Sequence, residues 1–93
     1  MHDPAKWLDE QLDDEQLTTE LAYSSPSQRL HEIDAKREIV RDYRRALTQR
    51  DDAEVGTDAY HRSVGAVTSL RRAVCLLAVA YAERPGFKEE WRP

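Results

Sequence analysis

The chain has 93 residues, of which 34% are charged and 40% are hydrophobic, and its net charge is −4. This length suits one domain with a small core, so residues 1–93 are interpreted as a single domain. The single cysteine excludes an internal disulfide. The first residues lack the features of a signal peptide, and the longest apolar run, Ala73–Ala82, has about half of the ~20 residues that a membrane span needs. We therefore expect a cytoplasmic protein that does not enter a membrane.

The first segment, residues 3–23, is predicted to form an acidic helix. Asp3 is a good N-terminal cap, and Pro4 suits the first helical position because its missing N–H is not needed there. The apolar residues do not form one stripe, since two leucines lie on one side and two nearer another: Leu8 and Leu12, and Leu17 and Leu21. This pattern indicates a bend or a broad contact face.

A second helix is predicted from the stretch "SSPSQ" to about Gln49. Ser25, Pro26 and Gln28 have the spacing of a capping box with proline at the first helical position. Apolar residues recur every three or four positions, as a helix face requires: Leu30, Ile33, Val40, Tyr43 and Leu47.

A third helix is predicted after the polar connection at residues 49–58, with Thr57 or Asp58 as its cap. Its apolar residues keep the helical spacing as far as Tyr81. Gly65 lies inside this helix, where it suggests a close approach of another backbone. Pro85 and Gly86 are expected to end the helix.

These elements predict an all-α fold with three helices. The second and third helices form a long antiparallel hairpin, the N-terminal acidic helix packs on it, and the C-terminal aromatic tail packs back. Phe87 and Trp91 in that tail are expected to cover the apolar end of the third helix. The alternative is that they lie on an external groove or a second subunit, as aromatic anchors do.

Two stretches resemble DUF6221, a family of small uncharacterised proteins of actinobacteria and their phages. They are "SPSQRLHEIDAKREIVRDYRRAL" (residues 25–47) and "CLLAVAYAERPGFKEEWRP" (residues 75–93), and the ending "EWRP" is the more specific. The resemblance implies an origin but no assigned activity. Relatives carry Cys and His in the middle segment, whereas this chain has only His61 between Leu47 and Val74. The resemblance therefore implies no metal site here.

The residues give little support for catalysis, a cofactor or a metal. His31 and Asp34 are three apart on one helix face, but His61 is distant in sequence, and a metal site needs three or four convergent ligands. Cys75 lies in an apolar run and is interpreted as a small buried hydrophobic residue, although Arg71 is one turn away. The sequence contains no phosphate-binding loop, nucleophile elbow or HExxH motif. We expect no enzyme activity.

Four arginines form a basic ridge on the second helix and are the candidate partner-binding residues, together with Trp91. Arg37, Arg41 and Arg45 are spaced by four, and Arg44 lies beside them. Like charges at this spacing repel by about 0.2–0.5 kcal/mol per pair, so an anionic neighbour is expected. It could be the acids of the first helix, from the same chain or another subunit, or nucleic acid phosphates. Plain solvation is the remaining alternative.

The pattern favours a small helical regulatory protein that binds another protein, and a homodimer. If the chain comes from a phage, a host protein is the expected target. The alternative is a nucleic-acid-binding accessory factor that uses the arginine ridge. A sequence pI near 5.3 opposes that alternative, because phosphate contacts need a basic surface.

Overall fold

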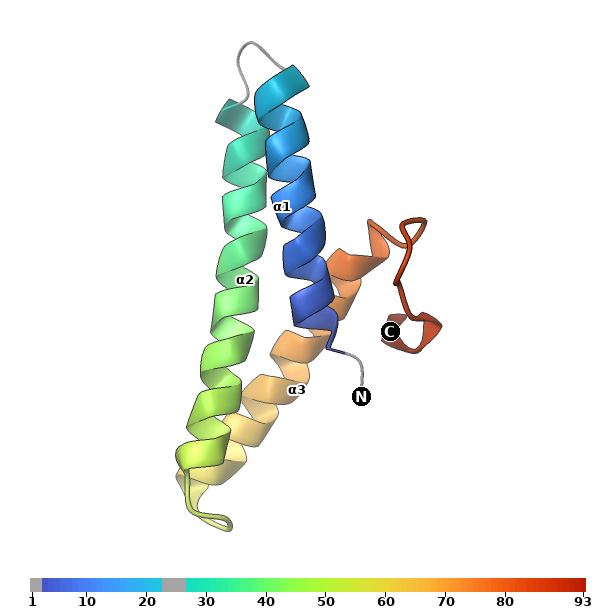
Figure 1. The fold of residues 1–93 in the computed structure, drawn as a ribbon. Coiled ribbons are helices and arrows are strands. Elements are labelled where there is room, and N and C mark those ends of the chain that lie inside the picture. The colour runs from blue at the N-terminus through green and yellow to red at the C-terminus, as the bar shows by residue number, and fades with distance from the viewer. Residues whose placement is uncertain (1–2, 23–26) are drawn as a thin grey trace.

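The computed structural model describes residues 3–22 and 27–93, and its regular elements there are all helical. They are α1 (Pro4–Ala22), α2 (Ser27–Asp52), α3 (Asp58–Val79) and the short 3₁₀ helix η1 (Glu89–Trp91). α1 and α2 lie antiparallel, and α3 returns at an angle from the far end of α2 and packs against both (Figure 1). α2 and α3 pack most closely. The predicted all-α hairpin arrangement is therefore confirmed over the described residues.

The predicted caps explain where two helices begin. The Asp3 carboxylate accepts a hydrogen bond from the Ala5 N–H at 2.9 Å, which satisfies one of the free donors of the first turn of α1. Thr57 caps α3, because its hydroxyl accepts from the Tyr60 N–H at 3.2 Å. The capping box predicted at Ser25 and Pro26 lies outside the described residues.

α3 ends earlier than the sequence predicts, at Val79 and not at the Pro85–Gly86 pair. The chain beyond it continues in tighter turns, since the N–H groups of Ala80, Tyr81 and Ala82 each bond to the carbonyl three residues earlier. Such 3₁₀-type turns are common at helix ends. Pro85 and Gly86 therefore lie in the connection that follows α3 and do not end the helix itself.

One hydrophobic core joins the three helices and the tail. Its largest fully buried side chains are Leu8 and Leu12 from α1, Ile33 and Val40 from α2, and Val74 from α3. The close backbone approach suggested for Gly65 is wrong, because a Cβ placed there would meet nothing within 4 Å. Gly65 lies on the exposed side of α3, away from this core.

The molecule is elongated, with principal extents of 52 × 27 × 16 Å. The distal ends of α1 and α2, next to residues 23–26, project beyond the part that α3 covers (Figure 1). The fold therefore buries apolar residues in the N-terminal half of α1 but provides no third helix at its distal end.

Candidate interaction surfaces

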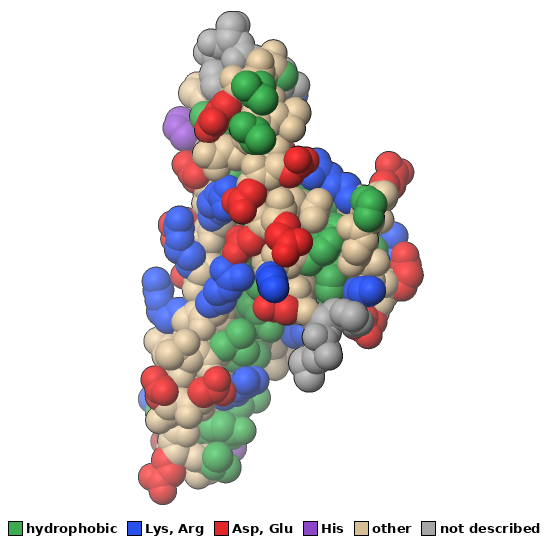
Figure 2. Space-filling view, in the orientation of Figure 1, with side chains coloured by type: hydrophobic (Ala, Val, Ile, Leu, Met, Phe, Trp, Pro, Cys, Tyr) green, Lys and Arg blue, Asp and Glu red, His purple; other side chains and the backbone are tan. Residues whose placement is uncertain are grey.

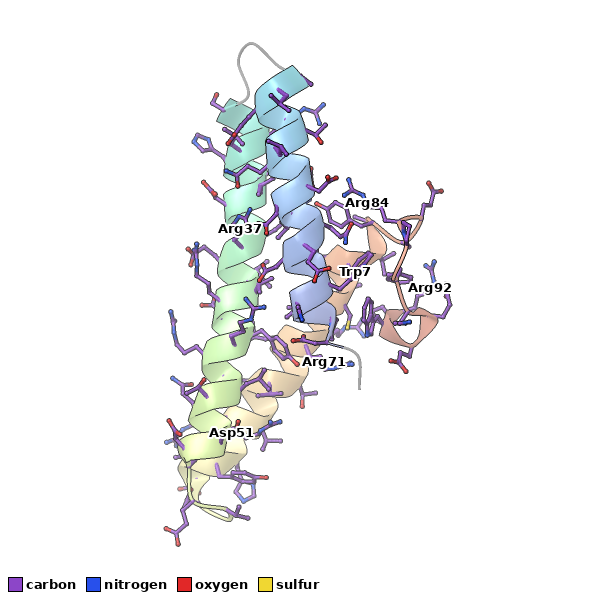
Figure 3. All side chains as sticks on the ribbon, viewed as in Figure 1. Trp7, Arg37, Asp51, Arg71, Arg84 and Arg92 are labelled. Atoms are coloured by element: carbon purple, nitrogen blue, oxygen red, sulfur yellow. The ribbon has the colours of Figure 1, made fainter. Side chains whose placement is uncertain are left out.

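Two of the four candidate arginines fasten α1 to α2. Arg37 points from α2 toward α1 (Figure 3), and its Nη2 lies 2.9 Å from both Asp13 Oδ1 and Gln16 Oε1. Arg44 Nη1 donates to Asp9 Oδ2 at 2.5 Å. The anionic neighbours of this part of the ridge are thus acids of the first helix in the same chain. Acidic and basic side chains alternate along this side of the molecule (Figure 2).

Within the part of the chain that the structure describes, the ion pairs of the other two arginines lie inside α2. Arg41 is bound to Glu38 and Arg45 to Asp42, each pair three residues apart. Their side chains remain 58% and 66% exposed, so these pairs add little to stability. The four arginines therefore do not form one site. Arg37 and Arg44 face α1, whereas Arg41 and Arg45 are the outward-facing arginines of the ridge.

The fifth candidate, Trp91, lies in the core and is 2% exposed. Its ring centroid is 5.5 Å from that of Trp7 and 5.6 Å from that of Phe87. Trp7 Nε1 also donates to the Pro85 carbonyl at 3.1 Å. The prediction that the tail packs back is confirmed. As the molecule stands, the Trp91 indole is not available on the surface to a partner.

Sequence reasoning missed Trp7 as the residue that receives the tail. Figure 3 shows its side chain pointing from α1 toward the C-terminal segment. A lone tryptophan in the second turn of an otherwise acidic helix was the available signal. It could not reveal its partner, because Trp7 and Pro85 are 78 residues apart.

A groove lies between α3 and the C-terminal segment and has a volume of about 480 Å³. Its lining residues come from these two elements: Val67, Thr68, Ser69, Arg71, Arg72, Cys75, Glu90, Trp91, Arg92 and Pro93. Trp91 Nε1 is buried and has no acceptor among the described residues. A buried donor without a partner costs about 1–3 kcal/mol.

The arginines that line this groove differ in how far they interact with other residues of the chain. Arg71 Nη1 lies 3.8 Å from the Cys75 sulfur. Burial raises the pKa of the Cys75 thiol and the charge of Arg71 opposes this, so the net effect keeps the thiol protonated. Arg72 is exposed and makes no ion pair with the described residues. The groove therefore combines apolar walls with an excess of positive charge, since three arginines and one acid, Glu90, line it.

A second apolar surface lies near the C-terminal end of α1, on the helix face that points away from the core. Leu8 and Leu12 are fully buried, whereas Leu17 and Leu21 are 58% and 79% exposed. Positions 17 and 21 are one turn apart and lie on the face of the helix opposite to positions 8 and 12. The sequence predicted a bend or a broad contact face in α1. The structure instead shows two separate apolar faces, and the face with Leu8 and Leu12 is the one that packs in the core. Hydrophobic atoms are visible at this end of the molecule in Figure 2.

A polar cluster, which sequence reasoning also missed, connects α1, α2 and the chain just after α3. The Tyr81 hydroxyl donates to Glu15 on α1 and accepts from Lys36 Nζ on α2 at 3.0 Å. Burial and the hydrogen bond to Glu15 raise the pKa of Tyr81, against the effect of Lys36. Burial alone would lower the pKa of Lys36, but Tyr81, Glu15 and Glu32 raise it overall. The cluster therefore favours a neutral tyrosine and a charged lysine.

Among the described residues, no group of three or more His, Cys, Asp or Glu side chains is arranged to hold a metal ion. Over the same ranges, no helix is long and apolar enough to cross a membrane. His31 and His61 are both exposed, on α2 and α3 respectively.

These surfaces define a small all-α protein with an internally paired arginine ridge, an exposed apolar face and one basic groove. The chain belongs to DUF6221, a family of unknown function, whose model matches residues 1–93. The family resemblance seen in the sequence is thereby confirmed. No curated protein and no solved structure matches the chain.

Proposed function

We propose that this protein acts by binding another protein, without catalytic activity, and that it forms a homodimer in the cytoplasm. The observation that carries the proposal is the exposure of Leu17 and Leu21, at 58% and 79%. Burying a leucine side chain contributes about 1.5–3 kcal/mol. A twofold pair would bury four of them, which supplies a driving force that the monomer leaves unused.

The outward arginines extend this proposal to a further partner. Arg41 and Arg45 are exposed, and their ion pairs among the described residues are with acids of their own helix. A partner with an acidic surface could replace those weak pairs, and such charges steer association more than they add affinity. If the chain is of phage origin, that partner would be a host protein.

The solution mass tests the proposed homodimer. Light scattering over a concentration series is expected to give twice the 10.8 kDa of one chain. A variant with Leu17→Glu and Leu21→Glu is expected to remain monomeric, because four carboxylates would enter the interface.

Val55→Glu is the matched control for that variant. Val55 is 78% exposed and lies in the connection between α2 and α3, so its replacement should leave the mass unchanged. A wild-type chain that stays monomeric at every concentration would contradict the proposed homodimer.

Nucleic acid binding through the arginine ridge is the second candidate, favoured only by the adjacent, exposed Arg41 and Arg45. Asp9 and Asp13 already neutralise Arg44 and Arg37, which halves the positive charge available to phosphates. We therefore expect no mobility shift with duplex DNA or single-stranded RNA at low salt. A shift that Arg41→Glu with Arg45→Glu abolishes would favour this candidate instead.

A further inference from the structure

We propose that the groove between α3 and the C-terminal segment receives the distal end of α1 from a second copy of the chain. In this arrangement Leu17 and Leu21 enter the groove, and Glu20 faces Arg72. The inference rests on the proposed homodimer and specifies its two contacting surfaces.

The groove offers the chemistry that such a segment needs. Its walls include Val67 and Cys75, and its charged lining residues are three arginines and one acid, so the arginines outnumber the acid: Arg71, Arg72, Arg92 and Glu90. Arg92 is already paired with Glu89, and Arg71 lies against the Cys75 sulfur and makes no ion pair with the described residues. Arg72, on the exposed side of α3, is therefore the cation best placed to meet an incoming carboxylate. Figure 3 shows Arg71 on α3 and Arg92 on the C-terminal segment that bounds the groove.

The distal end of α1 has the complementary pattern. Leu17, Glu20 and Leu21 are spaced by three and four residues, so they share one helix face. Glu20 is exposed and, among the described residues, accepts a hydrogen bond from Gln16 of the same helix and makes no ion pair. The C-terminal end of a helix also carries partial negative charge. An apolar stripe beside negative charge thus matches an apolar groove with a positive rim.

The same chain cannot fill its own groove with this segment. Its leucines lie on the face of α1 opposite to the core residues Leu8 and Leu12, and the distal end of α1 projects beyond α3 (Figure 1). The occupant must therefore come from another molecule. In a twofold pair each copy gives one helix end and one groove, so the contact forms twice and the assembly closes as a dimer.

Charge reversal with rescue tests the arrangement. Arg72→Glu and Glu20→Arg each place like charges together at both contacts, and each is expected to weaken the dimer about tenfold or more. An equimolar mixture of the two variants is expected to dimerise like wild type. In the mixed dimer one contact is native and the other carries the reversed pair, so both are complementary. Light scattering and sedimentation would measure the masses and dissociation constants.

Arg62→Glu is the matched control, because Arg62 is exposed on the same helix but does not line this groove. It should leave dimerisation unchanged. Circular dichroism checks that every variant keeps its helices. A wild-type dimer that Arg72→Glu leaves intact would overturn the inference while the proposed homodimer stands. Weakening without rescue in the mixture would also overturn it, and a monomeric wild type would remove both.

Discussion

At the scale of single residues, two glycines permit turns in the chain on either side of α3. Gly56 and Gly86 have φ angles of +89° and +95°, which other residues adopt at a cost. A Cβ at Gly86 would lie 2.6 Å from Trp7 Nε1, whereas one at Gly56 would meet nothing within 4 Å. Gly86 therefore permits both the turn and the close contact of the tail with Trp7.

Alanine substitutions at the three glycines should have three different outcomes. Gly65→Ala should raise the free energy of unfolding by up to about 1 kcal/mol, because the site is helical and open. Gly56→Ala should lower it by about 1–2 kcal/mol through backbone strain alone. Gly86→Ala should lower it further, since Trp7 must move as well. Urea unfolding at one fixed chain concentration would measure all three.

Equal losses for Gly86→Ala and Gly56→Ala would mean that the tail does not press on Trp7 in solution. Gly56→Ala is the control here, because it shares the backbone strain but not the contact.

At the scale of the helices, the arginines of α2 have two different roles. Arg37 is 20% exposed and bonds to Asp13 and Gln16 on α1, while Arg41 is 58% exposed and bonds within α2. Bonds to a partly buried charge are stronger than those of an exposed pair. Arg37 and Arg44 thus form ion pairs between α2 and α1, whereas Arg41 and Arg45 form an exposed surface of α2.

Arg37→Ala should lower the free energy of unfolding by about 1 kcal/mol, whereas Arg41→Ala should change it by less than about 0.5 kcal/mol. Thermal unfolding followed by circular dichroism would compare the two variants. Equal effects would mean that the bonds between Arg37 and α1 do not persist in solution.

At the scale of the whole molecule, the cluster of Glu15, Lys36 and Tyr81 joins α1, α2 and the chain after α3. The folded-state pKa values of Tyr81 and Lys36 lie above their ordinary values of 10.0 and 10.5. Folding therefore favours the protonated form of both groups. Their contribution to stability is present below those ordinary values and is lost as pH rises through the folded-state values.

The urea midpoint of the wild type should therefore fall above about pH 10. Tyr81→Phe should lower the midpoint at pH 7, because the hydroxyl bonds are lost, and should flatten the alkaline decline. Tyr60→Phe serves as the control, since Tyr60 lies outside the cluster. A Tyr81→Phe variant that declines as steeply as wild type would show that the cluster does not couple stability to pH.

The helices, the caps at Asp3 and Thr57 and the all-α class were predictable from the sequence, because they depend on hydrophobic spacing and on contacts a few residues apart. The same patterns placed the end of α3 too late, since the apolar spacing continues to Tyr81 while the backbone changes to tighter turns after Val79. Helix periodicity also showed that Leu17 and Leu21 leave the face of Leu8 and Leu12. It could not say which face would be buried.

Only the tertiary structure decided which charges and aromatic rings meet. It placed Asp9 and Asp13 on Arg44 and Arg37, the tail on Trp7, and Tyr81 between Glu15 and Lys36. These contacts join residues 24 to 78 positions apart, and many alternative pairings satisfy the same local preferences. The packing of α1 on α2 selects the two ion pairs, and the packing of the chain after α3 on α1 and α2 selects the contacts of Trp7 and Tyr81.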